Sequence, residues 1–140
     1  MDWVLLAARI VFAYLFVNAG INHVRHRAMM AGYAGSKGLP FPALAVPGSG
    51  VVIFAGGLLI ALGAWADLGG LLIAAFLVPT AILMHAFWKV EVPMERMNDR
   101  VHFEKDVALA GAALAFFYLF NQFGPAIGLT IGDGRLFGAL

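Results

Sequence analysis

The sequence contains no cysteine. This absence excludes disulfide bonds, thiolate nucleophiles, iron–sulfur clusters and cysteine-bound zinc. Charged residues are also scarce: they make up 12% of the chain, whereas about a quarter is usual in a soluble domain. The formal net charge is only +1, so no nucleic-acid partner is expected.

Apolar residues take the place of the missing charges. They make up 62% of the 140 residues, and the mean hydropathy is +0.88. A helix needs about 20 apolar residues to cross a bilayer, and four stretches approach or reach that length: residues 3–22, 50–65, 68–88 and 106–123. The prediction is one all-α domain, an integral membrane antiparallel four-helix bundle, with the lipid bilayer as its surroundings.

Polar residues interrupt the first of these spans. No basic segment precedes it and no small-residue cleavage site follows it, so no removable signal peptide is expected. Arg9 would cost about 2.5–3.5 kcal/mol at a helix centre without a partner. It is interpreted either as an anion or headgroup site or, preferably, as a structural contact with Asn121, Tyr118 or Asp2. Asn18 is a candidate for an interhelical hydrogen bond.

The second and third spans carry the same hexamer, Gly-Gly-Leu-Leu-Ile-Ala, at residues 56–61 and 69–74. Small residues four apart let helices approach closely in lipid. Only Ala66 and Asp67 separate the two spans, which predicts a tight hairpin that crosses at Gly57 and Gly70.

The basic residues lie almost entirely on one side of the predicted bundle. Seven fall in the connections at residues 23–48 and 89–105: Arg25, Arg27, Lys37, Lys89, Arg96, Arg100 and Lys105. The side with the termini carries only Arg135, apart from Arg9 within the first span. The positive-inside rule predicts cytoplasmic connections and periplasmic termini.

All four histidines fall on the predicted cytoplasmic side, together with Glu104 and Asp106. Imidazole and carboxylate groups can bind zinc, copper or iron, which makes His23, His26 and His102 metal candidates. The simpler and preferred interpretation is that they are solvated interfacial histidines. Asp106 is expected to open the fourth helix and to favour its dipole.

His85 lies one turn before Lys89 in an aromatic segment, residues 84–88. A neutral imidazole there would suit a quinone carbonyl, with Trp88 beside the ring. A ligand pocket is then expected between His23, His85 and Glu104, with Glu104 or Asp106 as the polar partner of the His85 imidazole. The alternative is that His85 bonds to a neighbouring helix backbone or to Glu104.

Several motifs resemble the DoxX family over residues 5–120. They are Arg9 and Phe12 with Asn18-Ala-Gly20, Gly38-Leu-Pro40 with Pro42, the Gly56-Gly-Leu-Leu run, and Phe103-x-Lys105-Asp106. The resemblance implies a small four-helix protein of the bacterial inner membrane. It also implies a role seen in some relatives, a membrane subunit of a quinone-linked oxidoreductase.

The sequence departs from the family pattern at two places. Ile53 and Phe54 stand where a glutamate often precedes the paired glycines, and His23 stands where a lysine is frequent. Ion chemistry that depends on that glutamate therefore does not carry over.

Two functional hypotheses follow. The first is a membrane subunit or anchor of a quinone-linked oxidoreductase, with quinone as the cofactor and an oxidoreductase subunit as the partner. The second is a non-catalytic scaffold or a carrier of lipids or small molecules. A second copy of the chain is a further candidate partner. Without a nucleophile or a complete metal motif, a stand-alone enzyme is not expected.

Overall fold

The computed structural model describes residues 2–138 and residue 140, and this part of the chain is helical with no strand. The helices are α1 (Asp2–Arg25), α2 (Arg27–Ser36), α3 (Pro42–Leu62), α4 (Ala66–Met84), η1 (Phe87–Lys89), α5 (Pro93–Phe123) and η2 (Gly124–Ala126). Four segments, containing α1, α3, α4 and α5, are long and apolar enough to cross a membrane. The predicted all-α membrane bundle is confirmed.

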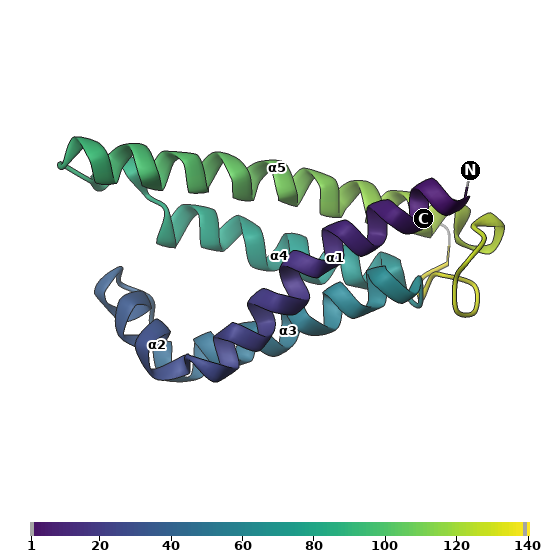
Figure 1. Ribbon diagram of the computed structural model, residues 1–140, viewed down its shortest axis with the longest axis horizontal. Coiled ribbons are helices and arrows are strands. Elements are labelled where there is room, and N and C mark those ends of the chain that lie inside the picture. Colours follow the sequence, from purple (N-terminus) through teal and green to yellow (C-terminus); the bar gives the residue numbers. More distant parts are fainter. Residues whose placement is uncertain (1, 139) are drawn as a thin grey trace.

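The four long helices form two pairs. α1 packs along α3, α4 packs along α5, and α3 joins the pairs through its contact with α4. Both termini lie at one end of the bundle, and the pairs diverge towards the other end, where α2 lies beside α3 (Figure 1). We call the end with the termini the closed end and the opposite end the open end.

Glycines bring the helix backbones together at each of these contacts. A Cβ atom at Gly20 of α1 would lie 2.6 Å from the Gly50 carbonyl oxygen of α3. At Gly69 of α4 it would lie 2.7 Å from the Gly56 oxygen of α3, which places the α3–α4 crossing at this pair. Since real Cβ contacts are not this short, each position requires glycine.

The predicted crossing at Gly57 and Gly70 is therefore wrong. Gly57 contacts Ala13 and Val17 of α1, and Gly70 lies against Ala113 of α5. Adjacent residues on a helix differ by about 100° in direction because a turn contains 3.6 residues. The two glycines of each pair consequently face different neighbours, so the repeated hexamer serves three contacts and not one.

The apolar core lies where the two pairs meet. Ile53, Ile60, Ile73 and Phe120 have no exposed surface. Ile53, at one of the two positions where the family resemblance implies a glutamate, is thus a core residue.

Two helices begin earlier than the sequence analysis expected. α3 begins at Pro42 and α5 begins at Pro93; a proline is tolerated in the first turn because its missing N–H has no partner there. Asp106 therefore lies inside α5, and its predicted position at a helix N-terminus is wrong. α5 has 31 residues, or about 46 Å at 1.5 Å per residue, and exceeds a hydrocarbon core of about 30 Å.

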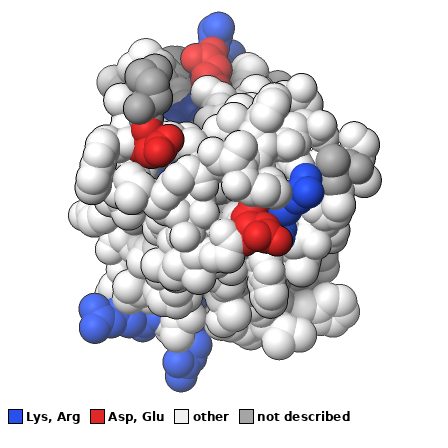
Figure 2. Space-filling model, turned by 90° about the vertical axis from the view of Figure 1, so that its right-hand side faces the viewer, with Lys and Arg blue, Asp and Glu red and all other residues white. Residues whose placement is uncertain are grey.

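The closed end is covered by residues 127–138 and Leu140, which we call the tail. Asp67 has no exposed surface. It accepts hydrogen bonds from the backbone N–H groups of Leu136 and Phe137 at 2.8 and 2.9 Å. Seen from this end, most of the surface is uncharged, with a few scattered charged side chains (Figure 2). The tail therefore packs as a cap on the bundle, held by buried polar groups.

Asn121 and the hairpin between α3 and α4 hold the tail at further points. The Asn121 Nδ2 donates to the Gly138 carbonyl at 3.0 Å, and its Oδ1 accepts from the Leu140 N–H at 3.1 Å. The N–H of Ala66 donates to the Gly134 carbonyl at 2.8 Å. The last of these bonds satisfies the first N–H of α4, which has no partner within its own helix.

Arg9 is buried beneath the same tail, with 1% of its surface exposed. Its Nη2 donates to the Leu129 carbonyl at 2.6 Å, and its guanidinium lies 5.8 Å from the centre of the Phe120 ring. The contact is structural as expected, but its partners are not the ones expected. Asn18 lies on the exposed face of α1 and has no hydrogen bond to another helix in the described chain.

Candidate ligand-binding site

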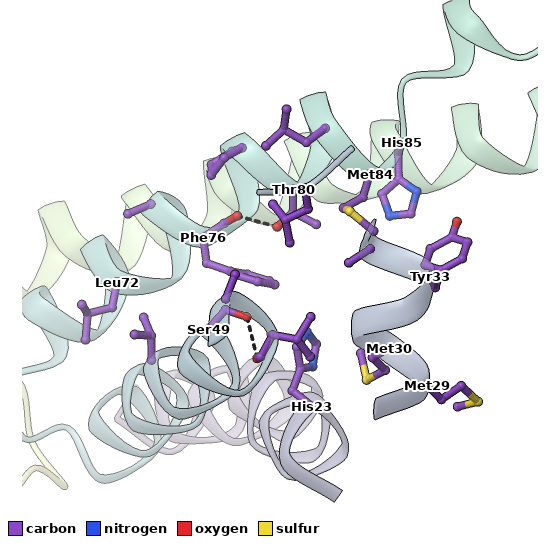
Figure 3. A pocket seen from close by; sticks show the side chains of 18 residues that line it. His23, Met29, Met30, Tyr33, Ser49, Leu72, Phe76, Thr80, Met84 and His85 are labelled. Carbon is purple, nitrogen blue, oxygen red and sulfur yellow. Dashed lines mark hydrogen bonds between the residues drawn. The ribbon is translucent and has the colours of Figure 1, made fainter. Parts of the chain in front are cut away.

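A cavity of about 800 Å³ lies at the open end, between α2, α3 and α4. The divergence of the two helix pairs creates it, because α2 is separated there from α4 (Figure 3). We call it the open-end cavity. Its volume falls within the range of roughly 300–1,000 Å³ that is common for small-molecule sites.

The walls of the open-end cavity are mostly apolar. α4 contributes Leu72, Phe76 and Leu83, and α2 contributes Met29 and Met30. Methionine side chains are flexible and adapt to the shape of a ligand. The cavity therefore suits a molecule that is largely hydrocarbon.

A small number of polar groups also lines the cavity. The hydroxyl groups of Ser49 and Thr80 donate hydrogen bonds to carbonyl groups of their own helices, at 2.9 and 2.7 Å. His23 Nδ1 is 2.8 Å from the Ala19 carbonyl, and its ring meets Phe76 edge-on at 5.9 Å. Tyr33 of α2 and His85, which follows α4, lie together at one end of the cavity (Figure 3).

His85 immediately follows α4, with 19% of its side chain exposed. Its imidazole lies between two carboxylates of α5. Nδ1 is 3.6 Å from Asp99 Oδ1, and Nε2 is 3.7 Å from Asp106 Oδ2. The ring also stacks on His102, with 5.0 Å between ring centres. His85 therefore borders the cavity on one side and an acidic cluster on the other.

The acidic cluster comes from one face of α5. Asp99, His102 and Asp106 are three and four residues apart, which places them on the same side of a helix. Both carboxylate residues are 6% exposed. Asp99 also forms an ion pair of 2.8 Å with Lys37, which follows α2, so the cluster links the two diverging halves of the molecule.

The ion pair also affects the charge state of Lys37. The hydrogen bond to Asp99 raises the pKa of Lys37 above its usual value. Lys37 is therefore a cation at neutral pH, and it holds Asp99 as its counter-ion.

Of the two carboxylates expected to partner His85, Asp106 lies beside its Nε2, whereas Glu104 is exposed and pairs with Arg100 at 2.8 Å. It lies two residues from both His102 and Asp106, which turns it to another face of the helix. Asp99 was missed because the helix was expected to begin at 106. The spacing of Asp99, His102 and Asp106 is the sequence signal that identifies the face.

The other predicted site residues are dispersed. Trp88 is half-exposed and packs edge-on against Phe87 and Phe103, outside the cavity lining. His26 is exposed. Among the residues described, no three histidine or carboxylate side chains are arranged to hold a metal ion. The structure brings His23 and His85 to one cavity but does not gather His23, His26 and His102.

The comparison with protein families agrees with this architecture. A family model described as DoxX matches residues 4–86, more than half of the chain. The chain belongs to the DoxX family. It is a multi-pass membrane protein of that family. Neither the search of curated proteins nor the search of solved structures found a match. The part matched to DoxX includes His23 and His85, whereas Asp99 and Asp106 lie beyond it.

Proposed function

We propose that this DoxX-family protein is a membrane subunit that binds a quinone in the open-end cavity on behalf of a partner oxidoreductase. The observation that carries the proposal is an apolar cavity of about 800 Å³ bordered by the imidazole of His85. A quinone combines a flat ring, two carbonyl acceptors and, in membranes, a long apolar tail.

The polar and apolar parts of a quinone match different parts of the site. An imidazole N–H is a suitable donor to a ring carbonyl. Leu72 and Phe76 line the cavity along α4, away from His85, and offer an apolar wall for the tail (Figure 3). Burying the tail there contributes roughly 25 cal/mol per Å² of apolar surface.

The orientation of the chain forms part of the same proposal. The seven basic residues of the two connections favour a cytoplasmic open end and periplasmic termini, in the bacterial inner membrane. The partner oxidoreductase would then reach the cavity from the cytoplasm. A reporter enzyme that is active only in the cytoplasm should be inactive when fused to the C-terminus, and an active fusion would contradict this orientation.

The binding test is purification from native membranes, followed by mass spectrometry of the bound molecules. Wild-type protein should retain quinone, and His85→Ala should lower its affinity about tenfold. One hydrogen bond contributes about 0.5–1.5 kcal/mol, and 1.4 kcal/mol corresponds to a factor of ten. His26→Ala is the matched control because His26 is exposed and does not line the cavity.

The same measurement tests a second function, the carriage of a lipid. The methionines of α2 and the scarcity of free polar groups in the cavity favour it. Retention of phospholipid or fatty acid without quinone, unaffected by His85→Ala, would support the carrier and overturn the quinone proposal.

A further inference from the structure

We propose that His85, Asp99 and Asp106 form a proton relay that supplies protons to the quinone in the open-end cavity. The inference rests on the proposed function. It assigns a role in proton transfer to two carboxylates of α5, Asp99 and Asp106.

The arrangement of the three side chains carries the proposal. Each ring nitrogen of His85 faces a different carboxylate, at 3.6 and 3.7 Å. Contacts of this length in a ligand-free site shorten when the reacting complex forms. Since His85 lines the cavity and the carboxylates lie behind it, the imidazole is the group through which a proton passes from the cluster to a ligand.

The two carboxylates have different roles. Asp99 is neutralised by Lys37 at 2.8 Å and faces Nδ1, which is buried without a hydrogen-bond partner among the described residues. Asp99 therefore orients the ring and stabilises its positive charge. Asp106 faces Nε2 and has His85 as its salt-bridge partner in the described chain. It is the carboxyl group that carries the exchangeable proton.

The charged and titratable groups around the imidazole complete this assignment. From α5 these are Asp99, His102 and Asp106, with Lys105 bonded to His102 at 3.2 Å. From the α2 side, Lys37 reaches the cluster through Asp99, and Tyr33 lies near His85 at the same end of the cavity (Figure 3). The Lys105–His102 pair lies at the exposed surface, so the cluster connects with water on the side away from the cavity.

The reaction balances as follows. A quinone takes up two electrons from the redox cofactor of the partner oxidoreductase and two protons to become a quinol. For each proton, the ring rotates so that Nε2 turns from Asp106 to the cavity, the N–H bond at Nε2 of His85 breaks and an O–H bond forms on a quinone oxygen. The ring then rotates back, Asp106 transfers its proton to Nε2, and Asp106 is reprotonated from water.

The test is electrode-driven reduction of decylubiquinone bound to the protein in lipid nanodiscs, followed by infrared difference spectroscopy. The electrode replaces the partner's redox cofactor. The wild-type spectrum should contain a carboxyl signal that Asp106→Asn abolishes, while quinone retention changes less than twofold. Asp133→Asn, an exposed carboxylate of the tail, should leave the signal in place.

A relay and a passive binding site give different results in this experiment. A wild-type spectrum without a carboxyl signal, or a signal that persists in Asp106→Asn, overturns the relay. Neither result contradicts the binding of quinone in the cavity. Failure of wild-type protein to bind decylubiquinone overturns both proposals. If Asp106→Asn does not fold, Asp106→Glu should shift the signal in frequency, and an unshifted signal would overturn the relay.

Asp99 is tested as a positioning residue by the pH profile of the reduction rate. Without its negative charge the imidazolium is less stable, so Asp99→Asn should move the fall in rate to lower pH while the Asp106 signal remains. An unmoved profile would remove Asp99 from the relay.

Discussion

The two ends of this bundle treat buried polar groups in opposite ways. At the closed end, Asp67 and Arg9 contact backbone groups of the tail. At the open end, His85, Asp99 and Lys37 contact one another's side chains. A peptide N–H or C=O does not change its charge, whereas an imidazole or a carboxylate does. A change in protonation can therefore alter both partners of a contact at the open end, but only one partner at the closed end.

The largest expected effect is on the closed end. Asp67→Ala removes the charged acceptor of the hydrogen bonds from the N–H groups of Leu136 and Phe137. A hydrogen bond to a charged group contributes about 1.5–3 kcal/mol, so the loss of both should lower the free energy of unfolding by about 3 kcal/mol or more. Unfolding in mixed detergent micelles measures this loss. Asp133→Ala, an exposed position in the same tail, should lose less than about 0.5 kcal/mol. Equal stability of the two variants would mean that the tail does not close the bundle.

A smaller effect is expected where the helices of the second pair touch. A Cβ atom at Gly70 would lie 2.5 Å from the Ala113 carbonyl oxygen, so α4 and α5 must separate in Gly70→Ala. Overpacking of this kind costs about 1–3 kcal/mol. Gly111→Ala is the control because nothing lies within 4 Å of the added atom. It should be neutral or stabilising in the same unfolding measurement, and a loss equal to that of Gly70→Ala would contradict the α4–α5 contact described above.

The smallest effect concerns the ion pair that joins the two halves at the open end. A double-mutant cycle of Lys37→Met and Asp99→Asn should give a coupling of about 0.2–1 kcal/mol, as for other solvent-accessible pairs. Because the pKa of Lys37 is raised in the folded protein, this coupling is complete below the ordinary lysine pKa and is lost as the pH rises through the raised one.

Stability measured against pH tests the ion pair without a second substitution. Wild-type protein should show an alkaline loss that Lys37→Met lacks. Lys89→Met, which removes an exposed lysine outside the pair, should retain the loss. A wild-type profile identical to that of Lys37→Met would show that the pair contributes nothing to stability.

The membrane bundle was predictable because a membrane-spanning helix is recognised by the length and the apolar composition of one continuous segment, and both can be read from the sequence. The family was predictable from motifs spread along the chain, and the family model matches residues 4–86. Antiparallel connectivity predicts that His23 and His85 lie at the same depth, and both line the open-end cavity. Asp106 was one of two carboxylates expected beside His85, whereas Asp99 was missed because its place on that face requires the true start of α5.

Long-range contacts were the least predictable part of the molecule. Nothing in the hexamer of α3 and α4 indicates that Gly57 turns towards α1 and Gly70 towards α5. The role of Asp67 was equally hidden, because its partners are backbone groups, which carry no sequence signature. Such contacts follow only from the three-dimensional arrangement of the helices.

The bonds that close the bundle also set an order of assembly during translation. The tail partners of Asp67 lie 69 and 70 residues further along the chain, which corresponds to roughly 4–14 s of synthesis at 5–20 residues per second. During that interval the carboxylate of the α3–α4 hairpin has no tail to pair with. The residues that pair with Asp67 therefore leave the ribosome well after the hairpin that they hold. A chain arrested before Leu136 would present an unpaired polar group to the proteases and chaperones that remove incomplete proteins.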